Sequence, residues 1–284
     1  MRKRGVLVYL VVTFGVSWAA MVVVARVLRL SLANPLPQLS FALVPALAAI
    51  VVRRWVTREG FGDAGLAPRF RAGWPYYLAA WFGPLGLLAA GVLVAVALGL
   101  YTPDLASLSR IVPGLPGPAL VGALLLVVVV LTPLYWGEEF GWTSYLRLRI
   151  LPGRPLAATL ATGLIWALWH FPLAFLGYVT YSNAVVGLLL WTTGFLCQEV
   201  MLTWLRLRSG TIWTTSLAHA GNNMVLSLLA SELLTVRGGL DDLVVMPVMQ
   251  APQLAVCAWI LLSGRYRAAR VPAAVPALSG TPWR

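Results

Sequence analysis

The sequence predicts an all-α fold: a polytopic transmembrane helical bundle of about eight spans, with both termini in the cytoplasm. Three features of its composition and one of its charge pattern lead to this fold class. The 284-residue chain is 60% hydrophobic and only 11% charged, its mean hydropathy is +0.84, and its basic residues recur in alternate loops. Soluble domains average about 25% charged residues, so water is not the solvent of this chain.

Long apolar stretches account for most of the chain. A helix needs roughly 20 mostly apolar residues to cross a bilayer. Unpaired backbone amides are costly in lipid, so each spanning segment must be a helix or a barrel strand, and the run 120–131 lacks the alternation of barrel strands. We therefore expect helical spans at about 5–25, 36–52, 74–100, 119–136, 155–176, 185–205, 212–230 and 243–263.

The basic residues predict the orientation of these spans. Cytoplasmic loops carry an excess of Lys and Arg, and an even number of spans places both termini on the same side. The chain is therefore expected in the cell membrane, as a multi-pass protein in contact with lipid and with no nucleic-acid partner. Most of the 21 basic residues fall in alternate loops: Arg2, Lys3, Arg4; Arg53, Arg54, Arg58, Arg69, Arg71; Arg147, Arg149, Arg154; Arg206, Arg208; Arg265, Arg267, Arg270, Arg284.

A few ionisable side chains fall within the predicted spans or at their ends. Ionisable groups in a membrane are expensive and normally face a bundle interior or a wet cavity, so each is a functional candidate. The alternative is structural: a lone His or Asn often hydrogen-bonds neighbouring helices, and Glu199, close to Arg206 and Arg208, is expected to have such a role or to form an ion pair. The set comprises Glu138, Glu139, His170, Glu199 and His219.

The spacing of these residues predicts which of them share a level in the membrane. Glu138 lies nine residues before Arg147, about 13 Å below the cytoplasmic face at 1.5 Å per residue, and His219 lies about 16 Å deep by the same rule. His170 would lie about 24 Å deep if its helix ran unbroken from Arg154. Asn223 follows His219 by four residues and lies on the same helix face.

Two chemistries fit this set of side chains. A carboxylate and an imidazole that share a water can remove its proton, while a second imidazole with a carboxamide can donate hydrogen bonds to a developing oxyanion. Alternatively, two His and a Glu could hold Zn²⁺ with one position open for water. The residues alone favour neither chemistry over the other.

Three short motifs in this region resemble the CPBP family of intramembrane proteases, also called the ABI family, which includes the type II CAAX prenyl endopeptidases. The motifs are Glu138-Glu139-Phe-Gly-Trp142, Trp166-Ala-Leu-Trp-His170 and His219-Ala-Gly-Asn-Asn223. The resemblance covers about 118–230, the expected protease-like core of a single transmembrane domain, 1–270. Residues 271–284 are expected to form a disordered cytoplasmic tail.

The resemblance implies a role for each motif residue. Glu138 would activate water with His170 as its partner, His219 and Asn223 would form the oxyanion site, and Glu139 would support them. No cofactor is required by this mechanism; were the enzyme metal-dependent, Glu138, His170 and His219 would hold the Zn²⁺. The family has Arg at the position of Thr143, which puts activity in doubt more than fold, unless Arg147 or Arg149 takes over its task.

The leading hypothesis is therefore an intramembrane endopeptidase that acts on a peptide or membrane-protein substrate near the cytoplasmic face. Two alternatives stay open. A proton-coupled transporter could use the same buried groups as a relay. A catalytically silent immunity or scaffold protein could share the fold, and Thr143 keeps that possibility alive.

Overall fold

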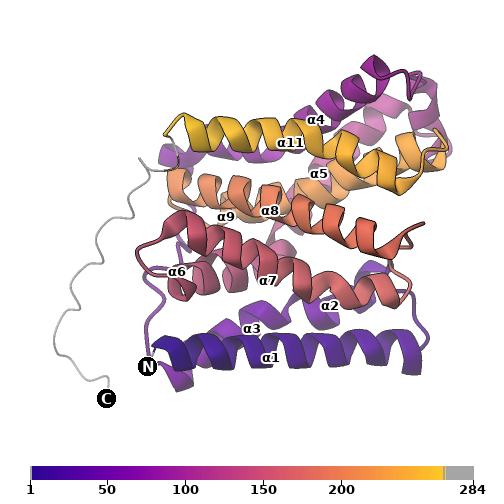
Figure 1. The fold of residues 1–284 in the computed structure, drawn as a ribbon. Helices are drawn as coiled ribbons and strands as arrows, with labels where there is room; N and C mark the ends of the chain where they lie inside the picture. Colours follow the sequence, from indigo (N-terminus) through magenta and orange to yellow (C-terminus); the bar gives the residue numbers. More distant parts are fainter. Residues whose placement is uncertain (1, 265, 267–284) are drawn as a thin grey trace.

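The computed structural model describes residues 2–264 and 266, and in this part of the chain all regular structure is helical (Figure 1). The all-α prediction is confirmed, whereas the predicted tail 271–284 lies outside the described residues. The α-helices are α1 (Arg2–Val22), α2 (Pro35–Ala42), α3 (Val44–Val51), α4 (Phe70–Ala97), α5 (Gly117–Gly141), α6 (Arg147–Ile150), α7 (Pro155–Phe175), α8 (Ala184–Ser209), α9 (Trp213–Gly221), α10 (Leu228–Ala230) and α11 (Asp242–Leu262).

Short π-helical turns extend several of these helices. They are η1 (Val23–Val27), η2 (Val52–Val56), η4 (Trp142–Leu146), η5 (Asn222–Ser227) and η6 (Ser231–Val236), and one 3₁₀ segment, η3 (Leu105–Arg110), precedes α5. Single π-helical turns inside α-helices occur frequently at functional sites. Two of them adjoin candidate residues here: η4 begins three residues after Glu139, and η5 contains Asn223.

Seven helices are long and apolar enough to cross a membrane, so the chain is a multi-pass membrane protein. Each coincides with one of the eight expected spans. They cover Lys3–Val27, Leu36–Val56, Phe70–Ala97, Gly117–Ile150, Pro155–Phe175, Ala184–Ser209 and Asp242–Leu262.

The expected span 212–230 is not among these seven. The chain is helical there, since α9 continues through η5, α10 and η6 to Val236, but His219, Asn222 and Asn223 make the segment more polar. Every residue of 214–221 is buried, and α9 packs against α4, α5 and α8. Because this helix faces protein more than lipid, it does not need an apolar surface.

The expected fourth span, 119–136, is too short. Helix α5 continues to Gly141 and, through η4 and α6, to Ile150, so the two glutamates lie inside a long helix and not at its end. Gly141 permits this course, because a Cβ atom there would clash with Pro45 of α3 and with Tyr9 of α1. The close approach of α3 buries the polar continuation of α5.

The loop between η2 and α4 fastens one end of the bundle. Asp63 of this loop accepts from two guanidinium groups, with Oδ1 2.8 Å from Nη1 of the buried Arg53 and Oδ2 2.9 Å from Nη2 of Arg149. Arg149 also pairs with Glu59, at 2.9 Å. The backbone N–H of Ile212, just before α9, donates to the carbonyl of Gly65, so the loop joins η2, α6 and the α8–α9 turn.

Replacing Asp63 with Asn tests how much these ion pairs stabilise this end of the bundle. The variant leaves Arg53 and Arg149 without their shared counter-charge, and we expect a loss of about 1–3 kcal/mol in the free energy of unfolding at pH 7. Burial alone would raise the pKa of the Asp63 carboxyl, but Arg149 and Arg53 outweigh it and hold that pKa below its usual range. The contribution should therefore be complete at pH 5, begin to fall near pH 4, and be lost as the pH drops through the lowered pKa of the folded state.

The measurement is the thermal unfolding midpoint in detergent of wild type and Asp63→Asn from pH 7 to pH 3. Glu232→Gln is the matched control, because Glu232 pairs with Arg237 at 3.7 Å, outside this fastening. An equal midpoint for Asp63→Asn and wild type at pH 7, or a difference that does not shrink on acidification, would contradict the assignment.

Candidate active site

The second glutamate of the pair forms the most direct contact between two of the motifs. Oε1 of Glu139 on α5 lies 2.9 Å from Nδ1 of His219 on α9, and both side chains are buried. The common level predicted for the Glu pair and His219 is confirmed by this contact. A carboxylate accepts, so Nδ1–H of His219 donates when Glu139 is ionised, which leaves Nε2 free for other partners.

The first glutamate points elsewhere, because consecutive residues of a helix are rotated by about 100°. Oε2 of Glu138 accepts a hydrogen bond from the indole Nε1–H of Trp166 on α7, at 2.9 Å. Glu138 retains 8% of its accessible surface, whereas Glu139 retains none. Of the two carboxylates, Glu138 is thus the more open to a water molecule.

The imidazole of His170 does not contact either carboxylate. Its Nδ1 lies 2.9 Å from the carbonyl of Trp166, one helical turn earlier, so Nδ1–H donates and Nε2 is left as an acceptor. Its ring packs against Phe195 at 4.4 Å between centroids. Because α7 runs unbroken from Pro155 to Phe175, His170 lies one helical turn beyond Trp166, the residue that donates to Glu138.

Aromatic rings bridge the remaining gaps in the site. The ring of Trp166 lies 5.1 Å from that of His219 and 5.8 Å from that of His170. Tyr135, one turn before Glu139 on α5, lies 4.7 Å from the His219 ring, and its hydroxyl accepts from Nδ2 of Asn223 at 3.2 Å. All five predicted site residues therefore contact one another directly or through Trp166 or Tyr135.

Thr143 occupies the position at which the resembling family has Arg. The threonine is buried, and its hydroxyl donates to the backbone carbonyl of Glu139 at 2.8 Å. Arg147 follows on the same face, buried, with Nε 3.3 Å from the carbonyl of Thr143. Arg149 is committed to Glu59 and Asp63, whereas Arg147 forms no ion pair with either glutamate of the pair among the described residues.

Glu199 is buried but does not belong to this cluster of contacts. Its Oε1 accepts from the hydroxyl of Thr203, one turn later on α8, at 3.0 Å. Arg206 donates to Ser144 and to the carbonyl of Asp63, and Arg208 donates to Tyr76. The predicted structural role fits these contacts, whereas neither arginine forms an ion pair with Glu199.

The side chains that could hold Zn²⁺ are not arranged as a ligand set. Over residues 2–264 and 266, no three His, Cys, Asp or Glu side chains lie in positions that could together hold a metal ion. In this arrangement Glu138 accepts from Trp166, and His170 donates to a backbone carbonyl.

Residues 118–225 match the family described as type II CAAX prenyl endopeptidase Rce1-like. The segment is an Rce1-like CAAX prenyl endopeptidase domain. It spans α5 to α9 and extends into η5, so all five predicted site residues fall within it. No curated protein gives a match to the chain.

Sequence reasoning missed two residues that form hydrogen bonds within the candidate site. Tyr135 links Asn223 to His219, and Gln198 accepts from Nδ2 of Asn222 at 3.2 Å. The sequence did indicate Gln198, because an amide side chain within an apolar span usually hydrogen-bonds a polar group of a neighbouring helix. Tyr135 carried no such signal, because aromatic residues are common in membrane helices and its contacts depend on tertiary structure.

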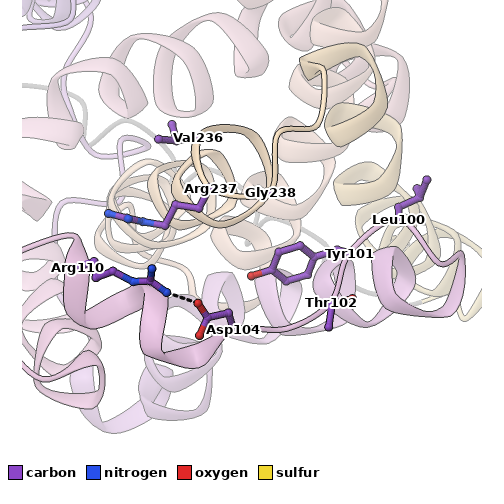
Figure 2. Close-up of a pocket in the computed structure, with 8 residues that line it drawn as sticks. All are labelled: Leu100, Tyr101, Thr102, Asp104, Arg110, Val236, Arg237 and Gly238. Atoms are coloured by element: carbon purple, nitrogen blue, oxygen red, sulfur yellow. Dashed lines mark hydrogen bonds and ion pairs between the residues drawn. The ribbon is translucent and has the colours of Figure 1, made fainter.

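Two cavities flank the Rce1-like domain. One of about 470 Å³ lies at the end of the bundle opposite the N terminus and contains none of the site residues. Figure 2 shows it lined by Leu100, Tyr101, Thr102, Asp104, Arg110, Val236, Arg237 and Gly238, with Arg110 paired to Asp104. The other, of about 300 Å³, includes Asn222 and Phe195 and so adjoins the site.

Replacing Trp166 with Phe tests how much the hydrogen bond from Trp166 to Glu138 stabilises the protein. The change removes the donor to a buried carboxylate, so we expect a loss of about 1–3 kcal/mol in the free energy of unfolding. Trp204→Phe is the matched control, because the Trp204 Nε1–H has no hydrogen-bond partner to lose. The measurement is denaturant or thermal unfolding in detergent, and equal losses in both variants would contradict the role of the Trp166 bond.

Proposed function

We propose that this chain is an intramembrane endopeptidase that hydrolyses a peptide bond near the cytoplasmic face with a water activated by Glu and His. The observation that carries the proposal is the meeting of three motif helices: Glu139 bonds His219, and Glu138 bonds Trp166, whose ring faces both histidines. The Rce1-like domain, which belongs to a protease family, supports the same chemistry and implies a protein substrate.

In the proposed reaction, Glu138 removes a proton from a water as its oxygen attacks the substrate carbonyl carbon. Nε2 of His170, free to accept, helps to hold that water. The carbonyl oxygen becomes an oxyanion that accepts from Nε2–H of His219 and from Nδ2–H of Asn223. Glu138 then delivers its proton to the amide nitrogen, and the C–N bond breaks to give a carboxylic acid and an amine.

The oxyanion role sets the number of protons on the Glu139–His219 pair. If Nε2 of His219 donates to substrate, the hydrogen bond between Nδ1 and Oε1 must contain a second proton. The pair is then neutral overall, either as carboxylate and imidazolium or as carboxylic acid and imidazole. A neutral pair also suits a site whose two side chains are withdrawn from water.

A second candidate is a catalytically silent immunity or scaffold protein on the same fold. Thr143 favours it, because a hydroxyl bonded to the Glu139 carbonyl brings no positive charge to the glutamates. Arg147 is the residue that could compensate. Cleavage by the wild-type protein decides between the two.

We expect purified wild type in liposomes to cleave peptides from a quenched fluorescent library. Glu138→Gln should slow cleavage about 10²–10⁴-fold, since it removes the general base. His219→Ala should slow it about 10²–10³-fold through loss of an oxyanion donor. Glu232→Gln, outside the site, is the control and should cleave like wild type.

The same assay with a chelator tests for a required metal ion, and full activity is expected. Absence of cleavage by wild type would contradict the protease assignment and favour the silent protein. Cleavage that survives Glu138→Gln would overturn the role of that residue. Loss of cleavage on chelation, with recovery on adding Zn²⁺, would replace direct activation by metal-assisted hydrolysis.

We also propose that both termini and the loop 57–69 face the cytoplasm. The start of α1, α6 and the end of α11 lie at one end of the bundle (Figure 1), and most of the basic residues belong to that end. An even number of crossings is required, so the polar helix from α9 to η6 would complete the seven apolar spans as an eighth.

Cysteine labelling tests this orientation. The native Cys197 and Cys257 are buried and are replaced by Ala. In intact cells, a membrane-impermeant maleimide should label Val112→Cys, in the loop before α5, and should label Gly60→Cys only after permeabilisation. The reverse pattern would contradict the orientation, and labelling of both in intact cells would contradict a membrane crossing by α4, the helix between them.

A further inference from the structure

The cavity of about 300 Å³ lies beside the candidate active site, between α8, the segment η5–η6 and α11. Phe195 separates it from His170, with 4.4 Å between the ring centroids. Asn222, also in its wall, is the chain neighbour of Asn223 and donates to that residue's Oδ1 at 3.4 Å. A molecule in the cavity would therefore contact Asn222, the residue next to the proposed oxyanion donor Asn223.

One wall of the cavity carries an unused hydrogen-bond donor. Gln198 retains only 8% of its accessible surface, and its Oε1 accepts from Asn222 at 3.2 Å. Its Nε2, however, is buried without any partner. A buried donor left unpaired costs about 1–3 kcal/mol, so a ligand that brings an oxygen acceptor to this point would relieve that cost.

The rest of the lining indicates the chemical class of the ligand. Met246 and Leu226 offer apolar surface, and Gln250 and Gln253 also line the cavity. Asp242 is the one charged residue among those that line it, and none is basic. The cavity therefore suits neither a phosphate headgroup nor a free carboxylate, and its several amides fit a peptide backbone better than an acyl chain.

We propose that this cavity binds the part of a peptide substrate next to the scissile bond. The bound stretch is uncharged and extended, places an aliphatic side chain against Met246 and Leu226, and offers a backbone carbonyl to Nε2–H of Gln198. At about 300 Å³ the cavity holds one or two residues, at the lower end of the range for ligand pockets. The inference rests on the proposed function and names the substrate class for it.

Photocrosslinking tests binding separately from cleavage. Met246 is replaced by p-benzoylphenylalanine, and the protein in liposomes is irradiated with biotinylated Ala-Leu-Leu-Ala amide or with biotinylated palmitate. Val244, on the same helix, 37% exposed and outside the cavity, carries the same amino acid in the control. We expect the Met246 position to capture the peptide well above the control and the palmitate no more than the control.

In the protein that carries p-benzoylphenylalanine at position 246, Gln198→Leu should lower peptide capture about fivefold, which is the effect of losing one hydrogen bond. Thermal unfolding of the same sample shows whether the variant is folded, and Gln198→Glu, which keeps an acceptor but lacks the amide donor, should also lower capture. Capture of palmitate alone would make this a lipid site and overturn the proposal. Peptide capture equal to the Val244 control, or unchanged in both Gln198 variants, would overturn it as well.

Cleavage assays of the same proteins separate this inference from the proposed function. Met246→Trp should raise KM for the peptide that wild type cleaves best and leave kcat within about twofold, while Val244→Trp changes neither. Peptide capture without cleavage by wild type would contradict the protease function and leave the binding site standing. Cleavage with an unchanged KM in Met246→Trp would overturn the assignment of the cavity.

Discussion

The hydrogen bond between Glu139 and His219 is the interaction on which the rest of the structure depends. It joins α5 to α9, and both partners are withdrawn from solvent. Breaking a buried polar pair by removing one partner is costly, because the other is left without compensation. The bond therefore fixes the register of α9 against α5, and with it the positions of Asn222 and Asn223.

This constraint explains why the helices differ in polarity and burial. The seven apolar spans face lipid with much of their surface, whereas α9 is enclosed by α4, α5 and α8 and can carry histidine and asparagine. At the basic end, Asp63 and Arg149 hold the loop 57–69 over the α8–α9 turn. The polar groups thus lie in a protein shell that excludes lipid, the condition under which ionisable residues persist in a membrane.

The sequence predicted the all-α fold, seven of the spans and the common depth of the Glu pair and His219. These follow from hydropathy and from the fixed rise of a helix, which are local properties. It did not predict that Glu139 would be the glutamate to contact His219, because that depends on the rotation of α5 about its axis. The end of α5 and the enclosure of α9 were also missed, since polar residues buried by neighbouring helices look like the end of a span. The role of Tyr135 could not be predicted either, because its contacts with His219 and Asn223 form only when the helices pack together.

The most direct test of the central claim is a double-mutant cycle between Glu139 and His219. Glu139→Ala, His219→Ala and the double variant are compared for cleavage rate and for free energy of unfolding in the same detergent. If the two side chains act as a unit, the double variant should lose about as much as the worse single variant, with a coupling energy of about 1–3 kcal/mol. Additive losses in both measurements would contradict the account.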